Sequence, residues 1–209
     1  YLFQFPWVIA RQNNLTASVN NLRRIGTRRQ DLRDETQRIE SRLAEQFRLR
    51  GFSVEIGYQP RRIDHEEDAG EIDLICHLDG IVLLIEVKSG YIRANKHEVW
   101  VHRNQTLRKA GWQLQRKSSA ALDALANDAN LRSRLGISDV ASPPPLHAWI
   151  VDSSIELDEK RINGFIVVSL EALHVILRDE RKLLHAPDQI DVLDQTSLFP
   201  NGFSADRLV

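Results

Sequence analysis

Two acidic side chains and one amine occur at spacings that would place them on one face of a β-hairpin. Asp73 lies in one apolar-rich run, and Glu86 and Lys88 lie in the next. The dipeptide Asp79-Gly80 separates the runs and favours a two-residue hairpin turn, because both central positions of that turn need a positive φ. Such a turn pairs position 78 with 81, and therefore Asp73 with Glu86. Lys88 shares their face because it follows Glu86 by two residues.

Facing carboxylates repel each other, so this pair requires a cation between them. Mg2+ prefers oxygen ligands and is commonly bound by one or two carboxylates and several waters. Lys88 would then stand where it could orient or deprotonate a metal-bound water. The alternative is a solvated salt-bridge ladder at a sheet edge, in which Glu71 faces Lys88 and Asp73 faces Glu86. The second run is apolar on both faces from Ile81 to Ile85, which favours a central strand instead.

The composition is that of an ordinary globular chain. It has 209 residues, of which 42% are hydrophobic and 27% charged, with a formal net charge of −1. Any DNA binding must therefore come from local basic patches. The single Cys76 and the lack of a bilayer-length apolar run favour a cytoplasmic protein without a membrane partner. The chain begins at Tyr1 and contains no methionine, so we expect a domain of a longer protein whose other domains are partners.

A first amphipathic helix is predicted from about residue 29 to residue 50. Apolar residues recur there at helical spacing, and Gly51 marks the end of the helix. Glu40 borders the apolar face, whereas Glu45 lies on the opposite face. A carboxylate at that border is either a partly solvated edge residue or a residue aimed into a cleft formed with the sheet.

A second helix is predicted from Asn104 to about Asn127. Gln113 and Lys117 lie a turn apart on one flank of its apolar band. Basic and aromatic residues interleave before and along this helix, a mixture that suits phosphates and bases and that also occurs on plain polar surfaces. The residues expected to contact nucleic acid are Arg93, Lys96, Arg103, Arg108, Lys109 and Lys117.

The remaining elements complete an α/β pattern. Strands are expected at residues 53–58, 146–151 and 165–168, and a helix capped by Ser169 should run to about Arg181. With the hairpin they predict a central mixed sheet of four to five strands flanked by helices. We expect this domain to cover residues 29–185. Residues 1–28 would be an N-terminal extension or part of a preceding region, and residues 186–209 a C-terminal tail.

This order of elements resembles the PD-(D/E)xK nuclease superfamily, especially its restriction-endonuclease-like and Holliday-junction-resolvase-like branches. The motif stands here as Gly70-Glu71-Ile72-Asp73 followed by Ile85-Glu86-Val87-Lys88, without the proline of the family name. The resemblance covers roughly residues 30–170 and implies a restriction-endonuclease-like core. It also implies that Asp73, Glu86 and the Val87 carbonyl bind Mg2+, for which Mn2+ would substitute, and that Lys88 is catalytic.

The resemblance assigns two further residues. Glu40 matches a glutamate that members often carry on the first helix, and it would bind the metal directly or through water. A glutamine on the helix after the Glu-x-Lys strand matches Gln113, with Gln115 as the other candidate.

The function implied is that of a Mg2+-dependent endonuclease that hydrolyses phosphodiester bonds, in DNA rather than RNA. The alternatives are a ribonuclease and a catalytically inactive nuclease-fold module that binds DNA or docks to protein. The retained acids and lysine favour the active enzyme. A homodimer is compatible with the sequence.

Overall fold

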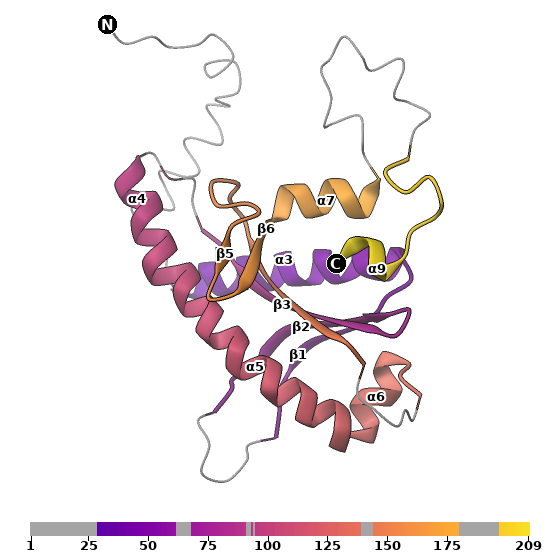
Figure 1. Ribbon diagram of the computed structural model, residues 1–209. Helices are drawn as coiled ribbons and strands as arrows, with labels where there is room; N and C mark the ends of the chain where they lie inside the picture. The colour runs from indigo at the N-terminus through magenta and orange to yellow at the C-terminus, as the bar shows by residue number, and fades with distance from the viewer. Residues whose placement is uncertain (1–28, 62–67, 91–92, 94, 139–143, 180–196) are drawn as a thin grey trace, which may run out of the picture.

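The computed structural model of the chain describes residues 29–61, 68–90, 93, 95–138, 144–179 and 197–209. A six-stranded sheet, flanked on both faces by helices, forms its centre (Figure 1). In chain order the elements are α3 (Arg29–Leu49), β1 (Ser53–Tyr58), β2 (Ile72–Leu78), β3 (Ile81–Lys88), α4 (Lys96–Val101), a π-helical segment η1 (His102–Leu107), α5 (Arg108–Asn127), α6 (Ala129–Leu135), β4 (Leu146–Asp152), β5 (Arg161–Ile162), β6 (Phe165–Ser169), α7 (Leu170–Arg178) and α9 (Ala205–Leu208).

The sheet is mixed, with the strand order β1-β2-β3-β4-β6-β5. The pairs β1–β2, β2–β3 and β5–β6 are antiparallel, and the pairs β3–β4 and β4–β6 are parallel. The expected α/β fold with a mixed sheet is therefore confirmed. The expected number of four to five strands is wrong, because the two-residue strand β5 folds back on β6 and adds a sixth strand to the described part of the chain.

The central hairpin forms as expected. Asp79 and Gly80 have φ values of +52° and +76°, so both turn positions are left-handed. Leu78 pairs with Ile81 and Leu74 with Ile85, which is the predicted register. β3 is the third strand of six, and its residues from Val82 to Val87 are buried, as expected for a strand covered on both faces.

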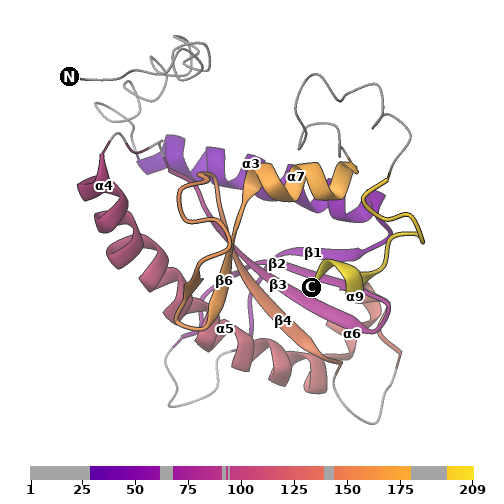
Figure 2. The ribbon, with the colours of Figure 1, turned by 45° about the horizontal axis from the view of Figure 1, so that its top comes forward.

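The helices divide between the two faces of the sheet (Figure 2). Val82 and Leu84 of β3 belong to the core cluster that contains side chains of α5 and α6. Leu83 and Ile85 belong to the cluster that contains side chains of α3 and α7. Glu86 follows the parity of Val82 and Leu84, so its side chain is directed to the α5 side of the sheet.

Helix α3 ends as predicted, because Gly51 takes a φ of +93° that favours glycine. Helix α7 begins at the predicted cap, where the Ser169 hydroxyl accepts a hydrogen bond from the Ala172 amide at 3.2 Å. It ends at Arg178 rather than near Arg181, because Asp179 adopts a left-handed φ of +59°.

The second long helix begins earlier than predicted. Its first turn starts at Lys96, where the side chain of Asn95 accepts a hydrogen bond from the Glu98 amide at 3.0 Å. The predicted start at Asn104 is therefore wrong. The π-helical segment η1 interrupts the 3.6-residue period between α4 and α5, so the periodic signal used to place the helix did not extend back to its start.

Residues 197–209 pack on the hairpin and on the residues that follow α3. The Ala205 amide donates to the Asp79 carboxylate at 3.1 Å, and Ala205 is fully buried. The Phe203 ring lies edge-on to Phe52, with 6.0 Å between the ring centroids. Residues 1–28, residues 62–67 of the loop before β2 and residues 186–196 of the predicted tail lie outside the described residues. None of the described helices combines the length and the apolar character needed to cross a membrane.

Candidate active site

Asp73 and Glu86 meet on the α5 side of the sheet, at the first residues of β2 and the last residues of β3. The Asp73 carboxylate accepts a hydrogen bond from the Val87 amide at 2.7 Å, which fixes it against the neighbouring strand. Glu86 is only 1% exposed. The alternative of a solvated ladder is thus wrong, and the Glu71 carboxylate accepts a hydrogen bond from the side-chain amide of Gln59 at 3.0 Å rather than pairing with Lys88.

A lysine from α5 lies between the two acids. The Lys117 ammonium donates to Asp73 Oδ1 at 3.0 Å and to Glu86 Oε2, and Lys117 is only 4% exposed. Its expected place on an exposed nucleic-acid-contacting surface is therefore corrected, because the side chain is buried against the two acids. Two features of the sequence indicated a buried position for Lys117. It lies on a flank of the apolar band of α5, and the facing carboxylates need a cation between them.

Lys88 provides a second ammonium on the same face. Its Nζ donates to Glu86 Oε1, so the two oxygens of Glu86 are paired with two different lysines. With Asp73, the group contains two carboxylates and two ammonium ions, and their formal charges cancel. This balance explains how the chain keeps Glu86 buried, since a buried charge is tolerated only when it is paired.

Helix α3 brings a third carboxyl group to the same region. The pKa of Glu40 is raised to about 7, first because the side chain is partly buried and then because the carboxylates of Asp73, Glu71 and Glu86 are near; Lys117 opposes the shift. Glu45 on the same helix is exposed, as predicted. Glu40 is therefore the helical carboxyl that lies beside the site.

Burial and mutual repulsion also affect the central pair. The pKa of Asp73 is raised by its burial and by Glu86, against the influence of Lys117, the Val87 amide and Lys88. The pKa of Lys117 is raised because Asp73 and Glu86 outweigh the effect of burial. Lys117 is accordingly protonated at neutral pH.

Gln113 lies one helical turn before Lys117 and is half-buried, whereas Gln115 is exposed. This difference favours Gln113 among the two candidates for a glutamine beside the site. Its role stays a prediction.

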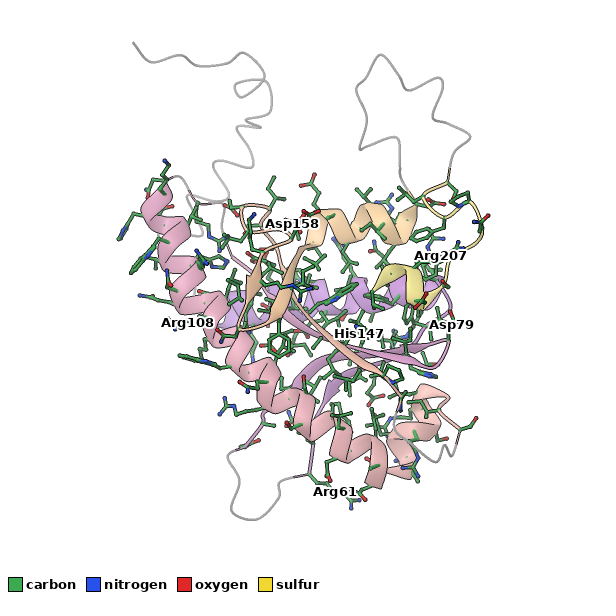
Figure 3. The ribbon with its side chains drawn as sticks, viewed as in Figure 1. Arg61, Asp79, Arg108, His147, Asp158 and Arg207 are labelled. Carbon is green, nitrogen blue, oxygen red and sulfur yellow. The ribbon has the colours of Figure 1, made fainter. Side chains whose placement is uncertain are left out.

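Arg93 does not belong to an exposed phosphate-binding surface. Its side chain is 5% exposed and forms contacts with Glu156, Ser154 and His102, so its assignment was wrong. The remaining predicted contacts are exposed along the second helix; they are Lys96, Arg103, Arg108 and Lys109. Figure 3 shows Arg108 on the side of this helix that faces away from the sheet.

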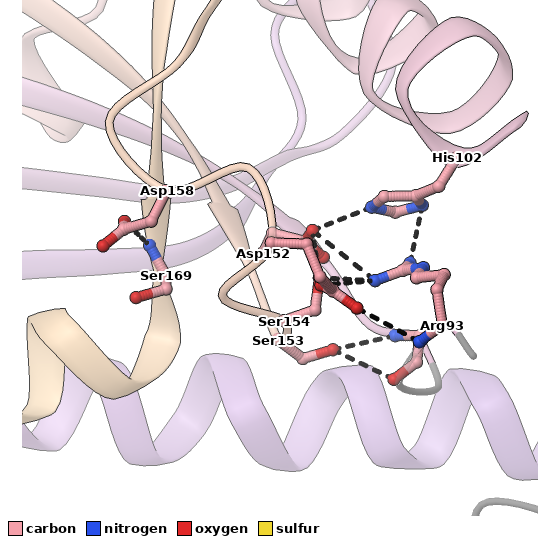
Figure 4. Close-up of polar contacts among 9 residues, drawn as sticks. Arg93, His102, Asp152, Ser153, Ser154, Asp158 and Ser169 are labelled. Atoms are coloured by element: carbon pink, nitrogen blue, oxygen red, sulfur yellow. Dashed lines mark hydrogen bonds and ion pairs between the residues drawn. The ribbon is translucent and has the colours of Figure 1, made fainter. Parts of the chain in front are cut away.

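A buried polar network adjoins the site at the end of β4 (Figure 4). Asp152 pairs with Lys88 in the parallel register and is fully buried. Its Oδ2 contacts His102 Nε2 at 2.7 Å and accepts from the Ser154 hydroxyl at 2.7 Å. Arg93 donates to His102 Nδ1 at 2.6 Å, so the imidazole is neutral and its Nε2–H donates to Asp152.

This network and the adjacent Ser153 hold the chain that follows Lys88. The Ser153 amide donates to the Lys88 carbonyl at 2.9 Å, and the Ser153 hydroxyl accepts from the Gly90 amide at 2.9 Å. The arrangement fixes the end of β3 and the start of the helical segment against β4. No periodic signal in the sequence indicated it, because its members lie on three separated segments.

The residues present fit a hard divalent cation in donor chemistry. Asp73, Glu86 and Glu40 offer carboxylate oxygens, and the pKa of Glu40 is raised by burial and then by the neighbouring acids, whose repulsion a cation would reduce. Within the described residues, no three side chains of histidine, cysteine, aspartate or glutamate are already positioned around one metal position. Lys117 lies between the two acids, so a metal ion shared by Asp73 and Glu86 requires this side chain to shift.

Comparisons of the chain with protein-family models, curated proteins and solved structures gave no match. What the site does must therefore be inferred from its residues and their geometry.

Proposed function

We propose that the chain is a metal-dependent nuclease that hydrolyses phosphodiester bonds, with DNA as the favoured substrate. The observation that supports this most directly is the pair formed by the partly buried Asp73 and the buried Glu86, which share the Lys117 ammonium at the open end of the central hairpin, with Lys88 on the other oxygen of Glu86. Paired acids with adjacent lysines suit a reaction that needs a hard cation and positive charge around a phosphate.

In this proposal Asp73, Glu86 and the Val87 carbonyl hold Mg2+, with Mn2+ as a substitute, and Glu40 contributes directly or through water. The ion would supply Lewis-acid polarisation of a phosphodiester oxygen. Lys88 positions the attacking water and offsets negative charge in the transition state. When it contributes through water, Glu40 is suited to accept a proton from that water.

The α5 side of the site supplies the remaining groups. Lys117 shifts from the acid pair toward the scissile phosphate when the carboxylates hold a metal, and it thereby adds a second positive charge. Gln113, one turn before it, orients Lys88 or the phosphate. The buried Asp152 network keeps Lys88 in place through the chain that follows it.

A second candidate function is a non-catalytic module with the same architecture. The observation that favours it is the complete pairing of Glu86 by two lysines. Such a charge-balanced cluster can serve structure alone, and the domain would then bind nucleic acid or dock to the rest of a longer protein.

The proposal is tested first by calorimetric titration of Mg2+ and Mn2+ into the purified chain. Saturable metal binding is expected for the wild type, and Asp73→Asn should weaken it at least tenfold. Glu45→Gln, which removes an exposed acid from α3, is the matched control and should titrate like the wild type. Equal heats for the wild type and Asp73→Asn would refute a metal site at this pair.

Cleavage of plasmid DNA, single-stranded DNA and RNA then separates the candidate functions. We expect Mg2+-dependent cleavage that is lost in Asp73→Asn and reduced at least a hundredfold in Lys88→Ala. Metal binding without cleavage of any substrate would favour the non-catalytic module. Preferential cleavage of RNA would show that RNA, and not DNA, is the substrate.

A further inference from the structure

The outer side of the helix that runs from α4 through η1 to α5 carries two large exposed rings. Trp100 is 59% exposed and Trp112 is 55% exposed. Tryptophan is usually buried for most of its surface, so two such side chains on one helix indicate a binding surface. His97 stacks on Trp100, with 6.2 Å between the ring centroids and 17° between the planes.

The π-helical segment η1 places the two tryptophans on one face. Trp100 and Trp112 are twelve positions apart, which in a regular α-helix would separate them by about 120° around the axis. The Arg108 amide bonds to the Arg103 carbonyl, five residues back, so this turn contains about one extra residue. The extra residue reduces the angle between the two tryptophans around the helix axis by roughly 100°, to about 20°. Along the axis the rings are roughly 17 Å apart.

The surface around these rings is basic. Arg108 lies over the Trp112 ring, with its guanidinium carbon 5.6 Å from the ring centroid. Glu98 is the only acid between residues 96 and 122, although the whole chain has a formal charge of −1. Its carboxylate accepts from the Asn95 side chain at 3.2 Å. The exposed cations of this surface are Lys96, Arg103, Arg108, Lys109 and Arg116.

We infer that this face, defined by Trp100, Trp112 and the five exposed cations around them, binds single-stranded nucleic acid. Flat rings stack on unpaired bases, and ammonium and guanidinium groups neutralise phosphates along the strand. In a duplex the base faces are covered, so the exposed rings distinguish a single strand from a double strand. A spacing of roughly 17 Å corresponds to about five nucleotides at the 3.4 Å spacing of stacked bases.

This inference rests on the proposed function for the identity of the ligand, since it names the substrate class of the same domain. It does not require hydrolysis. Lys117 lies on the buried side of α5, which faces the candidate active site. A nucleic-acid strand bound to the outer side would therefore be separated from that site by the helix. Binding and cleavage can therefore be measured separately.

The test is fluorescence anisotropy of a labelled 15-nucleotide dT strand with the full chain in EDTA, where no cleavage occurs. We expect saturable binding that weakens steeply with salt. Trp100→Ala and Trp112→Ala should each weaken it roughly 5- to 150-fold, and Trp112→Phe should recover most of the loss because a ring is retained. Leu122→Ala, which truncates another exposed apolar side chain of α5, is the matched control.

The outcomes distinguish this inference from the proposed function. Unchanged binding in both Trp→Ala variants, no binding by the wild type, or equal affinity for a matched duplex would overturn the inference. Loss of strand binding in the Trp→Ala variants together with full binding by Asp73→Asn supports it, even if no substrate is cleaved. Cleavage that persists in the Trp100→Ala/Trp112→Ala chain with unchanged KM for single strands would leave the proposed function intact and refute this surface.

Discussion

Replacement of Glu40 by glutamine should stabilise the protein at alkaline pH and have little effect at acidic pH. The pKa of Glu40 in the folded protein is about 7, against a reference value of 4.5. Because the folded pKa is raised, the folded chain retains a proton that the unfolded chain loses between about pH 4.5 and pH 7. The wild type therefore loses stability as the pH rises through that interval.

The size of the effect follows from the pKa difference. A shift of about 2.5 units corresponds to roughly 3.4 kcal/mol for a fully buried group. Glu40 is only partly buried, so solvent screening reduces this, and we expect about 1 to 2 kcal/mol. Glu40→Gln should raise the free energy of unfolding by that amount at pH 8 and by almost nothing at pH 4.5, because glutamine has nearly the same shape and cannot ionise.

Urea unfolding in EDTA at pH 4.5, 6, 7 and 8 measures this directly. The free energy of unfolding of Glu40→Gln minus that of the wild type should rise with pH, with unchanged m-values, and the melting temperature at pH 8 should rise by roughly 2 to 8 °C. Glu45→Gln controls for the loss of one glutamate charge from α3. An equal difference at pH 4.5 and pH 8 would show that the pKa of Glu40 is not raised in the folded protein.

Three further changes test the packing around the site. Lys117→Met should lower the free energy of unfolding by about 3 kcal/mol at pH 8, because it leaves two facing carboxylates without their shared ammonium; millimolar Mg2+ should recover part of the loss in thermal melts. Asp152→Ala should cost about 3 kcal/mol in urea unfolding, since His102 and its partners lose a buried acceptor. Gly111→Ala should destabilise by about 1 kcal/mol or more in the same assay: a Cβ there would lie 2.9 Å from the Asn163 Cβ, which outweighs the helix-propensity gain of about 1 kcal/mol. A stabilised Gly111→Ala variant would show that the turn at Asn163 moves readily.

The central hairpin and its acid pair could be predicted because the information is local. Asp79-Gly80 sets the turn, and the turn sets a register that pairs Leu74 with Ile85 and so brings the next residues, Asp73 and Glu86, together. The end of α3 at Gly51 was equally local, since it depends on one residue and the period before it. Six strands rather than five could not be predicted in this way, because β5 exists only through its pairing with β6.

The outcomes for Lys117 and Arg93 show what the sequence alone did not determine. A lysine on the flank of a helix can contact a phosphate or a buried acid, and the choice depends on where α5 lies across the sheet. Lys117 contacts Asp73 and Glu86 because α5 packs over the part of β2 and β3 where these two acids lie. Arg93 is buried because Asp152 and Glu156, from β4 and the loop after it, meet it from a distant part of the chain.

The sequence by itself thus determined the two acids, Lys88 and their common face, because strand parity and a two-residue turn act over a few residues. The tertiary structure decided which further groups join them. Glu40 and Lys117 come from helices on opposite faces of the sheet, and only the packing of both helices brings an acid and an ammonium to the same pair of carboxylates. The same packing leaves Trp100 and Trp112 exposed. The π-helical segment η1, which no periodic pattern in the sequence indicated, brings them to one face of the helix.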